Sequence, residues 1–537
     1  MRIWALRNIA ARQFVRRIEG NMDNSLYLIN PRSGTPGYFG AEVFEAWGLR
    51  PATSIADLAT TTVAALAPAN WDVSLCDEQF ESVEFDTAAE FVGLTGKVTQ
   101  ASRLIELANE FRRRGKTVIA GGPYASLSPA ALREHVDILV IGEMESVAAR
   151  LFSDLDNMCW SPEYVGARWG LSHSPMPRWS LYRNDRALVG CVQTSRGCPF
   201  DCEFCDVIAY LGHKQRHKPT DQVLAELDVL YGLGYRNVFI ADDNFTAYRR
   251  HARELLHALE DWNRSRTDGP MMFGTQLSID AARDSELVRQ CANAGIDWVF
   301  IGIETPNEAS LRECKKPQNL LLDLQTGINS FLANGIAVTG GMIVGFDHDG
   351  PDIFRRQHDF AMASAVPIFS IGALVAPAAT PLYNRMQNEH RLIEGGPEVA
   401  ALPWDTNIIP AQMSPEGLLV GMRWLCNSLY DPRSFSIRLT RMIDMLAPHP
   451  LGYFGGRKPR HVEMDSLMLT KKLASLGVAE NELIRTTLRT IKRRPHAARA
   501  AMTALFRYAQ LRCMYEQGDF WDPRSIEPDC SHMARFA

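Results

Sequence analysis

Short apolar runs alternate with stretches of helical periodicity between Asn24 and Leu155. The runs have the composition of strands buried on both faces of a parallel sheet, and they cover residues 26–29, 91–94, 117–120 and 137–141. Between two of them, apolar side chains recur at helical spacing, namely Ala101, Leu104, Ile105, Ala108 and Phe111. Gly115 is placed to end that helix. The pattern predicts a doubly wound α/β domain over residues 24–155, and the ligands of such domains bind at the carboxyl ends of the strands.

A second series of strand and helix patterns covers residues 189–385. Its strand candidates are residues 189–194, 237–241, 272–275, 298–302, 338–344 and 370–374. Their regular spacing predicts repeated βα units, in which functional side chains stand at the carboxyl ends of the strands. Residues 156–188 read as a linker between the two series, because the segment 175–181 is extended and punctuated by prolines.

The remainder, residues 386–537, carries apolar residues at helical spacing and predicts a helical C-terminal domain. Within it, residues 485–512 contain eight lysines and arginines and no acidic residue. A face of this kind is usually solvated. The alternative is contact with an anionic membrane surface or an acidic substrate.

The first 20 residues mix five arginines with scattered apolar side chains. They lack the continuous apolar core of a signal peptide. This basic extension, residues 1–23, either forms an amphipathic helix on an anionic surface or precedes a start of translation at Met22.

Composition narrows the class of protein. A chain of 537 residues is expected to hold two to four domains, and 46% hydrophobic with 22% charged residues is typical of a soluble globular protein. The formal charge of −5 gives no reason to invoke nucleic acid, and no apolar run approaches the roughly 18 residues of a membrane span. An odd, scattered set of 11 cysteines favours a reducing cytoplasm over a secreted disulfide framework.

Three cysteines, Cys198, Cys202 and Cys205, follow the first strand of the second series with the spacing C-x3-C-x2-C. Three thiolates can hold a cubane of four irons and leave the fourth iron open to a substrate or cofactor. A structural zinc site normally takes four protein ligands, and no second Cys/His pair lies nearby at zinc spacing. Chance clustering of buried cysteines is the remaining alternative. The spacing favours an iron-sulfur cluster.

The run Arg196-Gly197-Cys198-Pro199 and the aromatic Phe204 before the last cysteine resemble the radical S-adenosylmethionine superfamily. The resemblance implies a partial (β/α)6 barrel of the TIM type and a 4Fe-4S cluster on the three cysteines. It also implies that S-adenosylmethionine binds near residues at the strand ends, which are Phe204, Asp242, Asp243, Asn244, Gln276, Ser278, Glu304 and Gly341. Helix caps and strand-end turns are the alternative explanation for Asp243 or Glu304 taken singly.

The loops of the first domain resemble those of the cobalamin-binding domain that precedes many radical S-adenosylmethionine cores. The implied cobalamin residues are Gln79, Thr95, Gly121, Gly122, Pro123, Gly142 and Glu143. Gln79 stands where the D-x-H-x-x-G motif of other cobalamin proteins has the histidine that ligates cobalt, so we expect no histidine on cobalt. No G-x-G-x-x-G follows the first strand, which disfavours a dinucleotide. A vestigial scaffold without cobalamin is the alternative.

Further motifs resemble a subgroup that includes the hopanoid C-2 methylases, among them Asp242-Asp243-Asn244-Phe245 and Gly302-Ile303-Glu304-Thr305-Pro306. The segment Pro377-Ala378-Ala379-Thr380-Pro381-Leu382 departs from the Pro-Gly-Thr-Pro-Leu of relatives. In the family that this chain resembles, this loop borders the substrate. We therefore expect a substrate different from that of the relatives.

The resemblance implies a cobalamin-dependent radical S-adenosylmethionine C-methyltransferase that acts on an unactivated carbon. The expected substrate is large and apolar: a lipid, a tetrapyrrole or a natural-product scaffold. The expected reductant is a flavodoxin or ferredoxin. The resemblance assigns cofactor ligands and no catalytic side chain. The alternatives are an enzyme that uses both cofactors without methyl transfer, such as an oxidative cyclase, and a non-catalytic iron-sulfur electron carrier or sensor.

Overall fold

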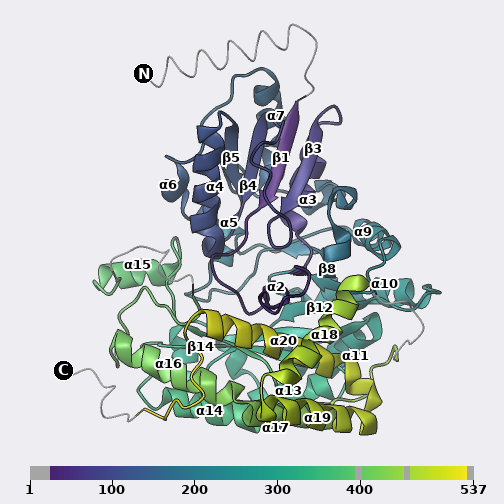
Figure 1. Cartoon of the computed structure of the whole chain (residues 1–537), viewed down its shortest axis with the longest axis vertical. Coiled ribbons are helices and arrows are strands. Elements are labelled where there is room, and N and C mark those ends of the chain that lie inside the picture. The colour runs from purple at the N-terminus through teal and green to yellow at the C-terminus, as the bar shows by residue number, and fades with distance from the viewer. Residues whose placement is uncertain (1–23, 394–401, 453–459, 529–537) are drawn as a thin grey trace. The chain divides into compact units, whose positions relative to one another are not determined.

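A computed structural model describes residues 24–393, 402–452 and 460–528 (Figure 1). These residues form two compact units. The first unit comprises residues 24–34 and 57–184, and the second comprises residues 35–56 and the chain from Asp185 onwards. The basic extension expected at residues 1–23 lies outside the described residues.

The first unit is built on a six-stranded parallel sheet in the order β3-β1-β4-β5-β6-β7. Its strands are β1 (Ser25–Asn30), β3 (Asp72–Asp77), β4 (Phe91–Thr95), β5 (Thr117–Gly121), β6 (Ile138–Ile141) and β7 (Glu163–Val165). The predicted doubly wound fold is confirmed, and the strand order reverses between β1 and β4. Ligands of such sheets bind at this switch point, outside the carboxyl ends of the strands.

Helices cover both faces of this sheet. They are α3 (Leu58–Leu66), α4 (Ala101–Arg113), α5 (Pro123–Leu127), α6 (Pro129–Leu132) and α7 (Ala148–Asp156). Phe111 of α4 packs with Val92 of β4 on one face, and Leu151 of α7 packs with Phe91 on the other. Successive residues of β4 are therefore buried on opposite faces, which explains why the strand reads as a continuous apolar run.

Two strands of the first sheet were not predicted from the sequence. In β3, Asp72 and Ser74 are exposed while Val73 and Cys76 are buried, as fits a strand at the edge of a sheet. β7 spans only three residues and lies within the stretch expected to be a linker. Short or half-polar edge strands carry too little apolar pattern to be recognised.

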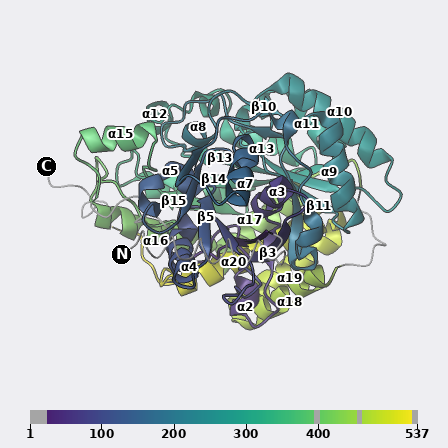
Figure 2. The same cartoon turned by 90° about the horizontal axis from the view of Figure 1, so that it is seen from above.

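The second unit holds a seven-stranded, all-parallel sheet in the order β15-β14-β13-β12-β11-β8-β2. Its strands are β2 (Thr53–Ile55), β8 (Ala187–Val192), β11 (Asn237–Ile240), β12 (Met272–Leu277), β13 (Ile296–Glu304), β14 (Ala337–Val344) and β15 (Phe369–Ala373). The predicted partial barrel is confirmed by six strands, β8 and β11 to β15. Figure 2 labels β11, β13, β14 and β15 of this sheet. β2 is an addition from the N-terminal part of the chain, paired with the start of β8.

Helices α9 (Thr220–Gly232), α10 (Arg249–Arg264), α11 (Ser285–Ala294), α13 (Leu324–Leu332) and α14 (Ile353–Ala363) alternate with these strands. The C-terminal region is helical, as predicted. It comprises α15 (Pro381–Asn388), α16 (Pro415–Tyr430), α17 (Pro432–Met445), α18 (His461–Ser475), α19 (Val478–Arg493) and α20 (Ala498–Gln517). Within the described part of the chain, no helix has the length and hydrophobicity needed to cross a bilayer.

The basic stretch 485–512 divides between surface and interior. Arg485 and Arg489 on α19 are exposed. Arg512 on α20 is buried, and its Nη1 pairs with the carboxylate of Glu480 at 2.7 Å. The stretch is therefore not one continuous solvated face.

Candidate cofactor sites

A two-stranded ribbon holds the loop that carries the three cysteines. The ribbon pairs β9 (Ser195–Arg196) with β10 (Arg216–His217) in antiparallel fashion. Gly197 follows β9 with φ of +95°, and a Cβ there would lie 2.8 Å from the carbonyl oxygens of Gly212 and Lys214. The Cys198 N–H then donates to the Gly212 carbonyl at 3.2 Å. Only glycine fits the first turn of this loop, because a side chain would meet the backbone of the segment that precedes β10.

The three thiols lie within electrostatic reach of one another. Cys202 is buried, whereas Cys198 and Cys205 are half-buried. Burial raises the pKa of all three thiols, that of Cys205 to about 12. Thiolates are disfavoured in such surroundings unless a cation takes them up, so the donor set fits a cationic group.

Within the described ranges, no three His, Cys, Asp or Glu side chains converge closely enough to hold a single metal ion. A cluster of four irons is larger than one ion, so its three thiolates do not need to converge on a point. Three thiols on one loop are the donor type that such a cubane takes.

Glu203 ties the cysteine loop to the helical region. Its carboxylate accepts hydrogen bonds from Arg385 of α15, with Nε to Oε1 at 2.8 Å. Its backbone N–H donates to the Cys314 carbonyl at 3.0 Å, and its own carbonyl accepts from Leu382 N–H at 3.0 Å. Arg385 also reaches Asp347, with Nη1 to Oδ2 at 2.5 Å. The loop is therefore held between the barrel and α15.

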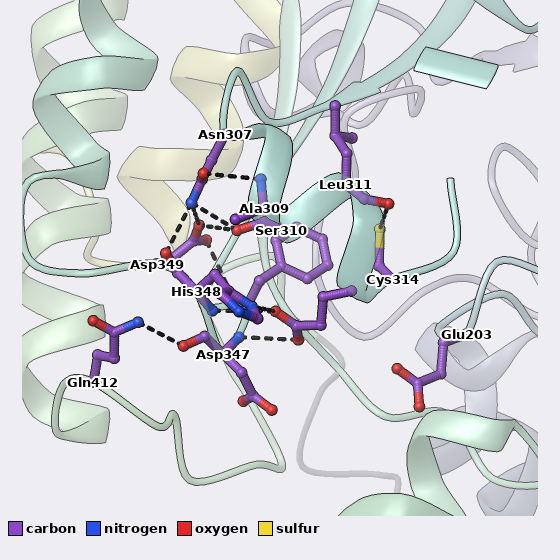
Figure 3. Close-up of polar contacts among 12 residues, drawn as sticks. Glu203, Asn307, Ala309, Ser310, Leu311, Cys314, Asp347, His348, Asp349 and Gln412 are labelled. Atoms are coloured by element: carbon purple, nitrogen blue, oxygen red, sulfur yellow. Dashed lines mark hydrogen bonds and ion pairs between the residues drawn. The ribbon is translucent and has the colours of Figure 1, made fainter. Parts of the chain in front are cut away.

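The turn after β14 places an aromatic ring beside Phe204. Asp349 accepts from the backbone N–H groups of Gly345 and Phe346 at 3.1 Å each. Figure 3 shows Asn307 and Ser310 directed at the same carboxylate, and Ser310 Oγ donates to it at 2.6 Å. The ring centroids of Phe346 and Phe204 are 6.1 Å apart. Asp349 was not predicted as a site residue, and it lies two positions beyond the Gly345-Phe346-Asp347 run that follows β14.

Asp242 and Asp243, both expected near S-adenosylmethionine, form hydrogen bonds with the cysteine-bearing segment. Asp242 is 1% exposed and accepts from the backbone N–H of Thr194 at 2.7 Å and of Ser195 at 2.9 Å, and from the Ser195 hydroxyl at 2.7 Å. Asp243 accepts from Gly197 N–H at 2.8 Å, and burial raises its pKa to about 6. In the structure both aspartates support the loop.

Asn244 and Ser278 come together at the ends of β11 and β12. The Asn244 amide donates to Ser278 Oγ at 2.7 Å, and among the described residues its Oδ1 is buried without a hydrogen-bond partner. The Gln276 side chain is half-buried nearby in the chain, and its carbonyl accepts from Phe245 N–H at 2.9 Å. An orphaned buried acceptor here fits a ligand that brings an N–H or O–H donor.

Glu304 ends β13 in a strained conformation, with φ of +62° at an irregularity in the pairing of β13 with β14. Its carboxylate forms a buried ion pair with the Lys316 ammonium group. Gly341 lies opposite Gly302, and a Cβ on Gly341 would lie 2.8 Å from the Phe300 ring. Strain on a buried non-glycine residue at a strand end is typical of functional sites. The sequence did not indicate a role for Lys316, because its ion-pair partner Glu304 lies on another element.

In the first unit, an open pocket lies at the carboxyl ends of the strands. Four of the expected cobalamin residues line it: Thr95, Gly121, Gly122 and Gly142. Gly122 has φ of +89°, and a Cβ there would lie 2.5 Å from Thr95 Oγ1. Most other lining residues are apolar, including Leu28, Ile119 and Phe152. A glycine-lined apolar pocket fits a flat ring system.

The other expected cobalamin residues are not among those that line this pocket. Pro123 begins α5, and the Glu143 carboxylate accepts from Trp169 N–H at 3.1 Å. Gln79 follows β3, where its amide donates to the Pro31 carbonyl at 3.5 Å. Its backbone N–H donates at 3.2 Å to Asp77, whose other carboxylate oxygen accepts from Tyr182 Oη at 2.6 Å. Burial raises the pKa of Asp77 to about 7.

Known proteins resemble much of this chain. Residues 192–359 match the model of the Radical SAM superfamily, and residues 380–517 match a domain of unknown function, DUF4070. An uncharacterized methyltransferase of Synechocystis sp. is 35% identical over 344 residues, which cover 63% of this chain and 64% of the relative. The hopanoid C-2 methylase of Rhodopseudomonas palustris is 29% identical over 339 residues, or 62% of this chain and 64% of that protein. The chain thus spans less than two thirds of the length of both relatives.

A solved structure shares the fold. The cobalamin-dependent S-adenosylmethionine radical enzyme OxsB, with aqua-cobalamin and S-adenosylmethionine bound, superposes with a TM-score of 0.59 over 92% of this chain and 80% of that chain, at 15% identity. The match to the Radical SAM superfamily model covers the cysteine loop and strands β11 to β14 of the parallel half-barrel.

Proposed function

We propose that the protein is a cobalamin-dependent radical S-adenosylmethionine C-methyltransferase. The observation that carries the proposal is the loop with Cys198, Cys202 and Cys205, presented by the first strand of a parallel half-barrel. The glycine-lined pocket of the first unit supports a second, flat cofactor. When bound, the cluster, S-adenosylmethionine and cobalamin would supply one-electron reduction, hydrogen abstraction from an unreactive carbon and a transferable methyl group.

This chain's residues would bind and orient those groups. The three cysteines would hold iron and leave one iron open. The buried, unpartnered Asn244 Oδ1 would accept a hydrogen bond from the amine of S-adenosylmethionine, and Glu304 would contribute from the end of β13. Gly341 would leave room for a flat ring beside β14. Cobalamin would occupy the pocket beside Gly122 and Gly142 without a histidine on cobalt, since the position after Asp77 and Glu78 is Gln79.

The inner face of the half-barrel supports a large, apolar substrate. In β13, Val299 and Ile301 are fully buried, whereas Trp298 and Phe300 on the opposite face are half-exposed. The Trp298 ring stacks on Phe239 of β11, with ring centroids 5.6 Å apart. Aromatic rings on the open face of the sheet suit an apolar carbon skeleton. The similarity to a hopanoid methylase agrees with a lipid-like substrate.

Anaerobic purification of the full chain, with reconstituted cluster and added hydroxocobalamin, tests the proposal. We expect about four irons per chain, as one cubane requires, and stoichiometric cobalt. The electron paramagnetic resonance spectrum of the Co(II) state should lack nitrogen splitting from a lower ligand. Iron without cobalt would contradict methyl transfer from cobalamin. Methionine formed without a methylated product would favour the alternative of a radical enzyme that transfers no methyl group.

A further inference from the structure

A short segment after α12 (Glu308–Glu313) brings an amide side chain to one of the cysteine sulfurs. This segment, the 3-10 turn Pro317–Leu320, carries Gln318, which is 3% exposed. Gln318 Nε2 donates a hydrogen bond to Cys202 Sγ at 3.6 Å, across 116 residues of sequence. The nitrogen–sulfur distance is normal for a sulfur acceptor, whose atomic radius is larger than that of oxygen.

The segment is fixed on both sides of Gln318. Asn319 Nδ2 donates to the carbonyls of Gly302 and Ile303 at 2.9 Å each, which anchors the turn to the end of β13. On the other side, the Lys316 backbone N–H donates to the Leu311 carbonyl at 2.9 Å. The amide of Gln318 is thus held at the sulfur by a rigid backbone.

The side-chain hydrogen bonding of Gln318 is one-sided. In the described part of the chain its Oε1 has no hydrogen-bond partner. Here the one hydrogen bond of the side chain goes to a sulfur of the cysteine loop.

The neighbouring charges largely cancel. The Lys316 ammonium group lies within electrostatic reach of Cys202, but it is paired with the Glu304 carboxylate. The N–H dipole of Gln318 is therefore the donor that acts directly on this sulfur. Hydrogen bonds to the sulfurs of an iron-sulfur cluster are among the factors that set its reduction potential.

We propose that Gln318 is a positioning residue that raises the reduction potential of the cluster bound through Cys202. One electron passes from a low-potential donor, of the flavodoxin or ferredoxin class, to the cluster, and no bond is made or broken. Reduction adds negative charge to the cluster and its sulfurs, so an N–H donor stabilises the reduced form more than the oxidised form. This inference rests on the proposed function, because it requires that the three cysteines hold a four-iron cluster.

A redox titration of the reconstituted full chain, monitored by electron paramagnetic resonance, tests the proposal. Gln318→Leu removes the donor at similar volume, and Gln318→Glu replaces it with a carboxylate that only accepts. At a fixed solution potential, we expect the ratio of reduced to oxidised cluster in Gln318→Leu to fall about tenfold, which is about 59 mV for one electron. Gln318→Glu should lower the ratio at least as far, since it adds negative charge near the cluster.

Gln357→Leu is the matched control. Gln357 is also a fully buried glutamine with an unpartnered Oε1 among the described residues, but its amide donates to the carbonyls of Ile343 at 2.7 Å and Glu304 at 3.4 Å and not to sulfur. The reduction potential of the cluster in Gln357→Leu should equal that in the wild type.

The outcomes separate this inference from the function on which it rests. A wild type without iron would overturn both. A wild type with about four irons per chain, whose potential is unchanged in both Gln318 variants, would overturn this inference alone. Loss of iron in both variants would also overturn it, because Gln318 would then be required for assembly of the site and not for its potential.

Discussion

The Asp243 carboxylate accepts a hydrogen bond from the backbone N–H of Gly197 at 2.8 Å. This contact joins the end of β11 to the glycine that opens the cysteine loop. The neighbouring Asp242 likewise accepts hydrogen bonds from the backbone N–H groups of Thr194 and Ser195. The two aspartates therefore hold the backbone of the cysteine loop in place. Their mutation should lower the iron content of the protein before it weakens the binding of any ligand.

Asp242→Asn tests this support. The amide retains one acceptor, but its NH₂ group would face donors of Thr194 and Ser195 that are buried. We expect the free energy of unfolding to fall by at least about 2 kcal/mol, because buried donors lose their partner. Iron retained after reconstitution should fall with it. Urea denaturation and iron analysis measure both effects, with the exposed Asp261→Asn as control. Unchanged iron in Asp242→Asn would contradict the supporting role.

Arg385 and Arg391 offer a matched pair of variants. Both guanidinium groups reach Asp347, but only Arg385 also binds Glu203 in the cysteine loop. Arg385→Met should lower the free energy of unfolding by about 1 to 3 kcal/mol and reduce iron content. Arg391→Met should cost similar stability and leave iron unchanged. Equal iron in the two variants, measured after identical reconstitution, would show that the loop does not depend on α15.

Asp77 predicts a pH dependence of stability. Burial raises its pKa from 3.8 to about 7, with a smaller contribution from the Asp57 carboxylate. The folded state therefore binds more protons than the unfolded state between these values, so stability should decline as the pH rises from about 4 through about 7. Asp77→Asn should flatten this decline. Thermal unfolding of the full chain at pH 5 and pH 8 measures it, and an equal decline in wild type and variant would exclude Asp77 as the cause.

Gly122→Ala tests the pocket of the first unit. The new Cβ would lie 2.5 Å from Thr95 Oγ1 at the pocket lining, so we expect loss of bound cobalt after incubation with hydroxocobalamin. Gly115→Ala is the control, because Gly115 also has positive φ but a Cβ there meets no atom within 4 Å. Both variants should lose about 1 to 2 kcal/mol to backbone strain. Only Gly122→Ala should lose cobalt, as measured by elemental analysis.

The sequence alone was sufficient to predict features that depend on short stretches of chain. The buried strands of both sheets appear as apolar runs, α4 appears through its helical period, and Gly115 marks where that helix ends. The spacing of Cys198, Cys202 and Cys205 predicted a three-thiol loop after a strand, which is where the structure has it. Such features depend on neighbours within one or two turns of chain, so local pattern determines them.

Only the tertiary structure decided which distant side chains meet. β2 pairs with β8 although Thr53 and its partner Ala187 are far apart in sequence. Asp242 turned out to face Thr194 and Ser195, and Gln318 to reach Cys202. These contacts follow from the path of the chain around the sheet, which brings loops together at one edge. A hydrogen bond between residues separated by more than a hundred positions leaves no period or spacing in the sequence from which it could be read.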